Sequence, residues 1–597
     1  MLQTIKKYAV FLFYAAINGF ITASGYVLML TSGLFPKTSV SERVDIFSID
    51  AVKRIDPVFL TAAFVCFTVV YFLIFFTKDK LYRQTVPISV LIFSFCVLTR
   101  SSYELPYLTI VLAAVAAVLV YVFKETFGRR EYKIFEGKKL YIFMCLITVL
   151  AVLMLSAGCI ARFYDFYTST YDFGIFAQMY ESMARDLTQT TTLERGMPMS
   201  HFHIHFSPIY YLLLPFYMIF RRPEFLLAAQ AAVCFSGVIP VLLLCKKYKY
   251  GNTITFFAGL VFLCYPAFTC ACFYDFHENV FLTPLILWLM YFVEGNSALG
   301  AAISGLLLLC VKEDAGVYLV IAGAYALIGK KSPKIIGPAL IVMGIGGFVG
   351  VTAFINAFGD GIMIDRYRIF LTEGQDSVVD VVLNIIKNPA YFLNNILSAE
   401  KLLLIMQMLL PVLFIPMKSR RLSDWVLIVP LLLFNLATDY SYQHSIHYQY
   451  VFSSGAFLVF LFVKNFRYEK RKNKAMTAAV FAAAICLVGA ATPKYYNIVR
   501  AKEEEAYFSA SREALAAVPR DKVIYASTYM TPYLYDCPRV YMYPAIYNEN
   551  ELPEPDYVVL DGRPGVLAEY YELVDMYIEM GFVEDGSGGF VTVLKKP

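Results

Sequence analysis

The chain has 597 residues, of which 59% are hydrophobic and 16% charged, with a mean hydropathy of +0.60. Soluble globular proteins have roughly 45–50% apolar and about 25% charged residues, so this composition excludes a soluble protein and indicates a polytopic membrane protein. The formal net charge is only +5, and no basic segment stands apart from the apolar runs. We therefore exclude a nucleic-acid partner.

Apolar runs long enough to enter a bilayer recur along the chain, and a helix needs about 20 residues to cross the hydrocarbon core. We predict fifteen transmembrane spans. The first is expected to be retained, because it is too long for a signal peptide and lacks a clear cleavage site. The spans are predicted near residues 8–32, 58–76, 85–99, 107–123, 140–160, 225–245, 253–271, 279–294, 298–312, 316–329, 335–356, 401–417, 424–438, 449–464 and 475–492.

Basic loops predict the orientation, because lysine and arginine collect on the cytoplasmic side of a membrane. The loops KKYK from Lys246, KSRR from Lys418 and KNFRYEKRKNK from Lys464 agree with one alternation if residues 208–220 do not span. That segment is short and contains a proline, which is typical of a re-entrant or interfacial element. We therefore expect an integral protein of the cytoplasmic membrane with its amino terminus inside and its carboxyl terminus outside.

In this topology five polar sequences lie at the outer face, and together they hold all six histidines. They are YDFG (171–174), HFHIHFSP (201–208), DFHE (275–278), KED (312–314) and QHSIHY (443–448). We expect them to line one external polar cavity. Within the long outer loop 161–224, the stretch YDFGIFAQMYESMARDL predicts a helix that lies along the membrane interface.

The composition changes from about residue 493. An amphipathic helix is expected in KEEEAYFSASREALAAVP, strands in KVIYAS, RVYMYP and DYVVLD, and a closing hairpin in GFVEDGSGGFVTVLKK. We divide the chain into amino-terminal transmembrane helices (1–139), a transmembrane core with the outer loop 161–224 (140–492), and a small extracytoplasmic α/β domain (493–597). We expect this last domain to have a supporting role.

Lys312, Glu313 and Asp314 separate two apolar runs. Ionisable groups beside membrane spans are costly, which makes them candidates for a functional site. One interpretation is a tight outer turn whose charges reach water. In the other, Lys312 holds a phosphate as a compact charge, and Glu313 or Asp314 orients it.

Asp275, His277 and Glu278 place three metal-binding or acid–base groups within four residues. A divalent metal ion is one expectation for them. The alternative is a helix start in which Asp275 caps the chain and Glu278 completes a capping box. His201, His203 and His205 alternate and would face one way in an extended segment, either to bind a metal or to anchor the chain at the interface.

Asp172 is a lone carboxylate in an aromatic outer loop. Such a position suits a general base. The alternative is an aspartate that caps the helix following it.

Taken together, these motifs resemble a known family. YDFGIFAQ, HFSPIYYLLLPFY, YDFHENVFLTPLILWLMYF, LLLLCVKEDAGVYLVIAGAYAL and SIHYQYVF, in this order, resemble the bacterial and archaeal membrane family called domain of unknown function 2079 (DUF2079). That family is similar to the GT-C integral-membrane glycosyltransferases, which include protein mannosyltransferases and aminoarabinose transferases. The resemblance implies a GT-C-like helix bundle, a catalytic acid in a large outer loop, and a sugar donor linked to polyprenyl phosphate.

The resemblance also assigns roles by position. Asp172 would be the general base, with His205 in the same loop, and Lys312 would meet the donor phosphate. The other implied site residues are Asp275, His277 and Glu278 at the acceptor or metal region, Glu313, Asp314 and Arg366 at the donor, and His447 and Tyr448 at the edge of the cavity. Two departures stand out: the loop here follows five predicted spans, four more than in the relatives, and the neighbour of Asp172 is Phe173 rather than a second acid.

The function expected is transfer of a sugar from a polyprenyl-phosphate donor to an acceptor glycan, lipid or protein at the outer face, with membrane lipids as further partners. A transporter or lipid flippase is the main alternative, because buried charges also line transport pathways. However, the charged motifs gather at one face and no inverted repeat is evident. A third alternative is a non-catalytic scaffold that displays the carboxyl-terminal domain.

Overall fold

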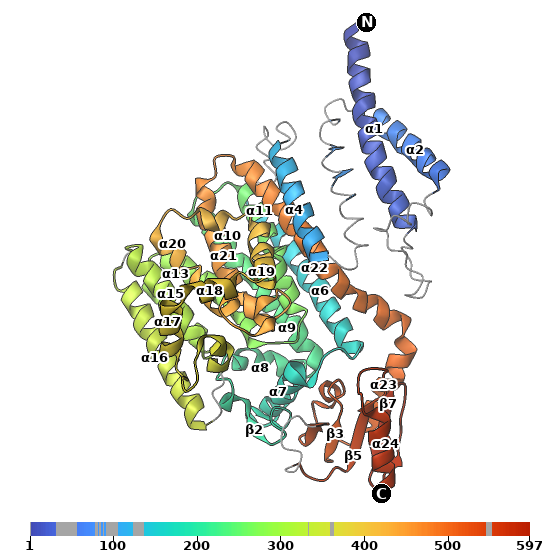
Figure 1. The fold of residues 1–597 in the computed structure, drawn as a ribbon, viewed down its shortest axis with the longest axis vertical. Coiled ribbons are helices and arrows are strands. Elements are labelled where there is room, and N and C mark those ends of the chain that lie inside the picture. The colour runs from blue at the N-terminus through green and yellow to red at the C-terminus, as the bar shows by residue number, and fades with distance from the viewer. Residues whose placement is uncertain are drawn as a thin grey trace.

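A computed structural model describes residues 2–31, 56–77, 82, 85–86, 89–90, 93, 105–122, 137–331, 333–358, 363–544 and 552–597. Figure 1 shows a bundle of helices with a small region containing a β-sheet at one end. Most of the predicted span near residues 85–99 lies outside the described residues.

The helices of the first half of the chain are α1 Leu2–Thr31, α2 Pro57–Thr77, α4 Leu105–Val122, α6 Lys139–Tyr164, α7 Ile175–Asp186, α8 Tyr210–Ile219, α9 Pro223–Ser236, α10 Val238–Lys247, α11 Asn252–Leu263, α12 Pro266–Cys272 and α13 Leu282–Glu294. Those of the second half are α14 Ala298–Leu309, α15 Ala315–Ile328, α16 Ile336–Phe358, α17 Val378–Lys387, α18 Pro389–Ile396, α19 Ala399–Leu409, α20 Leu422–Val426, α21 Phe452–Asn465, α22 Lys472–Glu503, α23 Glu505–Ala517 and α24 Tyr570–Glu579. Long apolar side chains such as Leu146, Leu150 and Leu153 stay exposed on α6, as expected of helices that face lipid.

The structure does not confirm fifteen spans. By length and composition, eight helical segments of the described residues can cross a membrane, or nine if the bent pair Pro389–Ile396 and Ala399–Val412 counts as one span. Predicted spans such as 298–312 and 316–329 form helices of 12 and 14 residues. At 1.5 Å per residue these reach about 18–21 Å, which is less than the roughly 30 Å of a hydrocarbon core. The segment predicted not to span forms α8, a helix of only 10 residues.

α15 and α16 pack closely because small residues face each other. A Cβ atom added at Gly316 would lie 2.5 Å from the carbonyl oxygen of Gly344, and one added at Gly323 would lie 2.7 Å from that of Gly337. Such small-residue contacts let membrane helices approach closely. They anchor α15 and so the KED turn just before it.

The carboxyl-terminal region holds the predicted strands. They form a five-stranded sheet in the order β4-β3-β5-β7-β6, in which β3, β4 and β5 are parallel and the closing hairpin β6–β7 is antiparallel. The strands are β3 Ile524–Ala526, β4 Val540–Met542, β5 Tyr557–Asp561, β6 Val583–Glu584 and β7 Val591–Lys595; a separate antiparallel pair is formed by β1 Thr190–Thr191 and β2 Met199–Ser200. The predicted boundary at residue 493 falls inside the continuous helix α22.

The loop 161–224 and the sheet region share a hydrophobic core. Phe166, Ile175 and Leu193 of the loop pack with buried residues of the sheet, and the Tyr533 ring stacks on Phe166 with centroids 4.2 Å apart. α7 is buried over residues 175–183. This differs from the predicted helix with one face in water, because Met179 and Tyr180 pack in the core of the helix bundle and Gln178 donates to the carbonyl oxygen of Cys537.

Candidate functional site

A cavity of about 480 Å³ lies among the turn before α15, the second half of α16, the 3₁₀ helix Met363–Phe370 and the start of α21. Its polar lining residues are His205, Asn279, Lys312, Glu313, Asp314, Tyr318, Thr352, Asn356, Arg366, Tyr367, Asp376, Gln443, Gln449, Tyr450 and Ser453. Among the predicted site residues, it brings together His205, Lys312, Glu313, Asp314 and Arg366.

Glu278 is buried beside this cavity and holds Lys312, which lines it. Its Oε1 lies 2.8 Å from Nζ of Lys312, and its Oε2 accepts a hydrogen bond of 2.6 Å from the Tyr210 hydroxyl. Nδ1 of His277 lies 2.8 Å from the same Oε2. Burial alone would raise the pKa of Glu278, but His277 and Lys312 hold it well below its usual range. Glu278 is therefore a fixed negative charge and not a proton acceptor.

Lys312 is only 6% exposed, so its charge does not simply reach water as the alternative interpretation required. Burial would lower the pKa of Lys312, but Glu278 and Glu313 raise it above its usual value. The ammonium group stays charged at the edge of the cavity. Its position is fixed by Glu278 before any ligand arrives.

Glu313 and Asp314 differ in pKa although they are neighbours. Oε1 of Glu313 lies 3.0 Å from Nδ1 of His205, and the Tyr318 hydroxyl donates a 2.8 Å hydrogen bond to Asp314. Burial opposes ionisation of Glu313, but His205 and Lys312 outweigh it and bring its pKa to about 2. Burial and the charge of Glu313 raise the pKa of Asp314 to about 6.

Six buried oxygen atoms of cavity residues have no hydrogen-bond partner among the described residues. They are Oδ1 of Asn279, Oε2 of Glu313, Oδ1 of Asp314, Oγ1 of Thr352, Oε1 of Gln443 and Oε1 of Gln449. Buried polar atoms normally have partners, so these acceptors suit a ligand that brings its own donors. The Asn279 acceptor was missed from the sequence, where an asparagine following DFHE carried no distinguishing signal.

Arg366 adds a second cation to the cavity. Its guanidinium lies over the rings of Tyr440 and Tyr450, at 5.2 and 5.1 Å from their centroids. These contacts hold the planar group through cation–π attraction.

Asp172 lies in a second cluster next to this cavity. Its carboxylate hydrogen-bonds to the Tyr274 hydroxyl, and its charge acts on Asp275 and on Tyr450 of the cavity wall. Asp275 is 1% exposed and pairs with Arg162 at 2.5 Å. Burial raises the pKa of Asp275 to about 6; Arg162 opposes this rise and Asp172 adds to it.

The structure therefore supplies the acidic neighbour that Asp172 lacks in sequence. Asp172 and Asp275 each stand in a Tyr-Asp-Phe tripeptide, at 171–173 and 274–276, and a third copy occupies 164–166. This repeated tripeptide was the signal that could have linked them. Neither aspartate caps a helix: the residue before α7 is Gly174, and the turn after DFHE starts from His277. Both capping alternatives were wrong.

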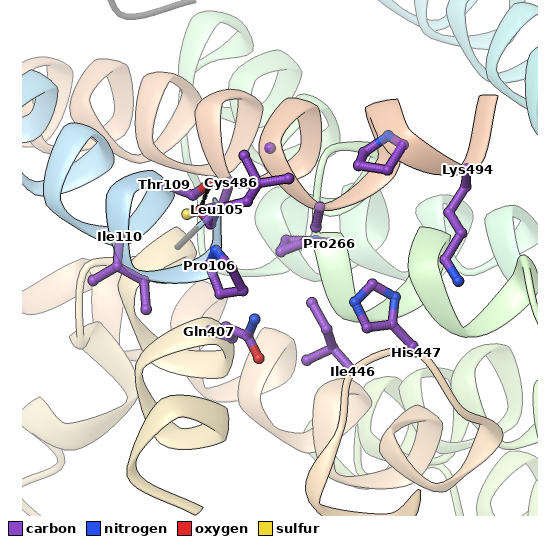
Figure 2. Close-up of a pocket in the computed structure, with 13 residues that line it drawn as sticks. Leu105, Pro106, Thr109, Ile110, Pro266, Gln407, Ile446, His447, Cys486 and Lys494 are labelled. Carbon is purple, nitrogen blue, oxygen red and sulfur yellow. Dashed lines mark hydrogen bonds between the residues drawn. The ribbon is translucent and has the colours of Figure 1, made fainter. Parts of the chain in front are cut away.

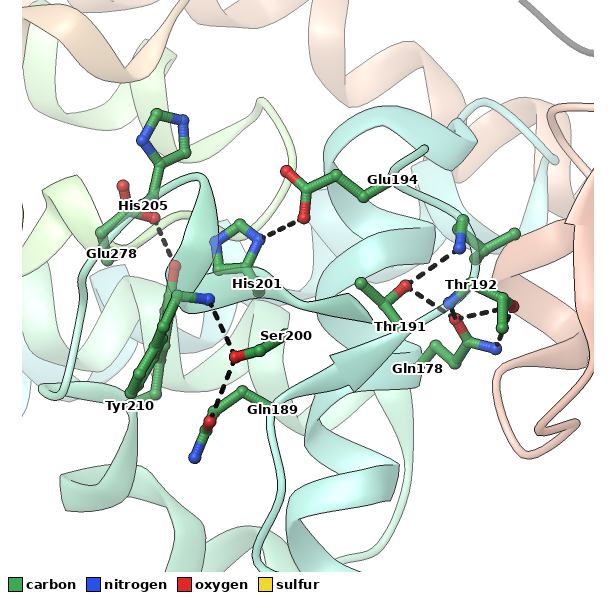
Figure 3. Close-up of polar contacts among 12 residues, drawn as sticks. Gln178, Gln189, Thr191, Thr192, Glu194, Ser200, His201, His205, Tyr210 and Glu278 are labelled. Atoms are coloured by element: carbon green, nitrogen blue, oxygen red, sulfur yellow. Dashed lines mark hydrogen bonds and ion pairs between the residues drawn. The ribbon is translucent and has the colours of Figure 1, made fainter. Parts of the chain in front are cut away.

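The three histidines of HFHIHFSP do not share a face. Residues 201–203 form a 3₁₀ turn instead of an extended segment. Nδ1 of His201 lies 2.7 Å from Glu194, His205 reaches Glu313, and His203 stacks on Phe358. Figure 3 shows His201 directed to Glu194 and, nearby, Tyr210 bonded to Glu278. The prediction that all six histidines line one cavity was wrong, because only His205 lines it.

Gln230 was also missed. Its Nε2 donates to the carbonyl oxygens of Cys272 and Asp275, at 3.1 and 3.3 Å, and its Oε1 accepts from the backbone N–H of His277 at 2.9 Å. One buried amide thus holds the backbone of the DFHE loop. A glutamine inside the otherwise apolar run LLAAQAAV was the available signal.

His447 and Tyr448 lie apart from the Lys312 cavity. His447 lines a different cavity, shown in Figure 2. Tyr448 packs on Tyr274, with ring centroids 4.9 Å apart, which places it on the Asp172 side. Only Tyr448 of this pair therefore borders the candidate site.

The residues predicted to bind a metal do not form a metal site. Asp275 pairs with Arg162 and Glu278 with Lys312. Across the described parts of the chain, no group of three or more His, Cys, Asp or Glu residues is arranged to hold a metal ion. We therefore derive no step through a metal, and metal dependence stays a prediction.

Comparisons with known proteins agree with this architecture. The family described as "Predicted membrane protein (DUF2079)" matches residues 162–572. The structure is similar to the crystal structure of ArnT from Cupriavidus metallidurans bound to undecaprenyl phosphate, with a TM-score of 0.50 and 11% identity over 77% of this chain and 98% of that one. The apo form of ArnT gives a TM-score of 0.42 and 13% identity over 75% and 98%. No curated protein matches the chain.

At 11% identity the first of these likenesses shows the fold alone, and it confirms the predicted GT-C-like helical bundle. The apolar helices and the family match show an integral membrane protein. Because the match covers more than half of its residues, the chain belongs to the DUF2079 family of predicted membrane proteins.

Proposed function

We propose that the protein is a membrane glycosyltransferase that moves a sugar from a polyprenyl-phosphate donor to an acceptor hydroxyl at the outer membrane face. The observation that carries this proposal is the composition of the cavity. It combines a buried, pre-positioned lysine with carboxylate and amide oxygens that lack donors. A glycosyl phosphate has the complementary groups: an anionic phosphate and a ring of hydroxyl donors.

Lys312 and Arg366 would hold the phosphate. As the bond between the anomeric carbon and the phosphate oxygen breaks, negative charge grows on the leaving phosphate. Cations fixed in advance stabilise such charge without reorganising during the reaction. Lys312 meets this condition because Glu278 holds its ammonium group at 2.8 Å.

Glu313, Asp314 and Asn279 would hold the sugar. Each has a buried oxygen that needs a donor, and each sugar hydroxyl can supply one. A site whose buried polar groups are left unpaired by the wrong ligand discriminates strongly against that ligand. The same oxygens would therefore select which sugar binds.

Asp172 would be the general base. Its carboxylate removes the proton of the acceptor hydroxyl while the acceptor oxygen attacks the anomeric carbon. The electron pair of the broken bond leaves on the phosphate oxygen, and the anomeric centre inverts. Asp275 would act with Arg162 behind Asp172 and not as the base itself, because its carboxylate is already committed to that arginine.

The first test uses the full-length protein in nanodiscs and the release of undecaprenyl phosphate from a panel of undecaprenyl-phosphate-linked sugars. Undecaprenyl phosphate is the lipid bound in the ArnT structure, which makes it the first probe. Asp172→Asn should lower turnover by about 10²–10⁴-fold, the usual contribution of a general base, and leave donor binding unchanged. A variant that turns over normally would contradict the assignment of Asp172.

Lys312→Gln should weaken undecaprenyl phosphate binding by about tenfold, the loss of one charged hydrogen bond. That change leaves Glu278 buried without its cation, and the single variant could fail to fold for this reason alone. The double variant Glu278→Gln, Lys312→Gln removes both charges, so lipid binding can still be measured in a folded protein. Lys387→Gln, at an exposed lysine of α17, is the matched control. Normal lipid affinity in the double variant, or transbilayer movement of the lipid-linked sugar without turnover, would instead favour the transporter or flippase alternative.

A further inference from the structure

A second cavity, of about 170 Å³, lies outside the Lys312 site. It is formed between the start of α4, the start of α12, α19 and the Pro493 region of α22, with the segment before α21 closing one side. Figure 2 shows Lys494 and His447 at one end and Leu105, Pro106 and Ile110 at the other. The cavity therefore has a polar end and an apolar end.

The polar end carries a cation without an anion. No described acidic residue acts on Lys494; the groups that do are the Arg162 cation and the neutral Cys270 thiol. Nδ1 of His447 is buried and has no hydrogen-bond partner. Burial and the neighbouring Lys494 lower the pKa of His447 to about 4, so its ring is neutral and can present an N–H. A lysine charge beside the bilayer interior is costly unless it is paired, so this end suits an anion.

The apolar end suits a hydrocarbon chain. A cavity of about 150 Å³ lined by apolar side chains holds a molecule the size of benzene, so this one has room for a headgroup and the first carbons of a chain. Tyr107 and Val111 are exposed on the outer side of α4, at 65% and 37%. The rest of a chain could continue over that surface into lipid.

The cavity also adjoins the Asp172 cluster through one short segment. Tyr448 is extended, with φ −125° and ψ 161°, so side chains on consecutive residues point to opposite sides. His447 faces the second cavity, and Tyr448 packs on Tyr274, which bonds to Asp172. Whatever occupies the cavity therefore lies directly behind the wall of the candidate site.

We propose that this cavity binds an anionic membrane lipid, with its headgroup between Lys494 and His447 and the start of its chain among Ile110, Pro266 and Cys486. Bound there, the lipid supports the segment 446–448 and so the Tyr448–Tyr274 contact beside Asp172. This binding does not depend on the transferase activity. The site is separate from the Lys312 cavity and takes its lipid from the surrounding bilayer.

The test maps lipid contacts by photolabelling. The full-length protein is placed in phosphatidylcholine nanodiscs with a trace of phosphatidic acid that carries a diazirine in its acyl chain, and labelled peptides are identified by mass spectrometry. We expect labelling in residues 105–110 and 486–494. Lys494→Gln should lower that labelling by about tenfold, as expected for loss of one charge-assisted bond. Lys494→Arg should retain it.

Lys502→Gln is the matched control, because it removes the same charge from an exposed position on the same helix. Equal labelling by a phosphatidylcholine probe, or unchanged labelling in Lys494→Gln, would overturn the proposal. Protection by inorganic phosphate alone would assign the site to a free anion and overturn the lipid as its ligand. In the wild-type protein, labelling that misses residues 105–110 and 486–494 would also overturn the proposal without any variant.

Discussion

Two buried lysines lie near opposite ends of α21: Lys312 beside its start and Lys464 near its end. Comparing them shows what separates a binding site from a structural ion pair. Ser453, at the start of the helix, lines the Lys312 cavity, and Lys464 lies near its end, roughly 16 Å away along the axis at 1.5 Å per residue. Lys312 is 6% exposed and Lys464 1%. By burial alone the second lysine is the stronger candidate.

Their surroundings differ. Lys464 pairs with Asp424 and donates a 2.6 Å hydrogen bond to the Tyr325 hydroxyl, and the nearby Glu294 pairs with Lys331 at 2.5 Å. Two cations are thus matched by two carboxylates within packed helices. Lys312 instead borders a cavity whose walls hold unpaired acceptors. A buried charge marks a site here only when space and unsatisfied groups accompany it.

The largest loss of stability should come from replacing Lys464. Lys464→Met leaves Asp424 buried without its cation, and breaking a buried pair in this way costs about 3–5 kcal/mol. The double variant Lys464→Met, Asp424→Leu should recover most of that loss, because apolar replacement of a whole buried pair is often neutral. Thermal unfolding in detergent measures both. Unchanged undecaprenyl phosphate affinity in the double variant would support the structural role, and a tenfold loss would contradict it.

The next effect is a pH dependence to which Asp275 contributes, together with Asp314, whose pKa is also raised to about 6. The pKa of Asp275 is about 6 in the folded protein against an ordinary value of 3.8, so the folded state binds the proton more tightly than the unfolded state. This contribution to stability is full below pH 3.8 and is lost as the pH rises through 6, on the order of 3 kcal/mol in total. Asp275→Asn should reduce the change in unfolding free energy between pH 4 and 7 and leave the part that Asp314 contributes. An unchanged slope in that variant would mean that another group titrates there.

Much of the fold could be predicted because it depends on local composition. Apolar runs predicted the long helices, and alternation bounded by turns predicted the strands and the β6–β7 hairpin. The number of spans could not be predicted, because an apolar run does not reveal where the helix breaks. α7 shows a second limit: its amphipathic pattern suggested a lipid surface, but its apolar face packs in the core of the helix bundle, and Gln178 bonds to Cys537, more than 300 residues away in sequence.

The sequence could predict which residues belong to the candidate site but not which of them pair with one another. The KED and DFHE motifs gave Lys312 and Glu278, and the structure joins them across 34 residues. The partners of Asp172 and His201 were not predictable, because Asp275 and Glu194 are selected by the folding of separate loops. Lys464 shows the opposite case: it reads as the first residue of a basic cytoplasmic loop and is buried.

The smallest expected effect is a change in lipid affinity on replacing Arg366, the second cation of the cavity. Arg366→Lys keeps the charge and loses the stacking of the guanidinium on Tyr440 and Tyr450. Each exposed cation–π contact contributes about 0.5–1 kcal/mol, so undecaprenyl phosphate affinity should fall by about fivefold, measured by titration in nanodiscs. Arg420→Lys is the matched control, since Arg420 lies over the Tyr468 ring at 4.8 Å and outside the cavity. Equal affinities for both variants would show that Arg366 holds the loop and not the phosphate, and would leave Lys312 as the cation on which donor binding depends.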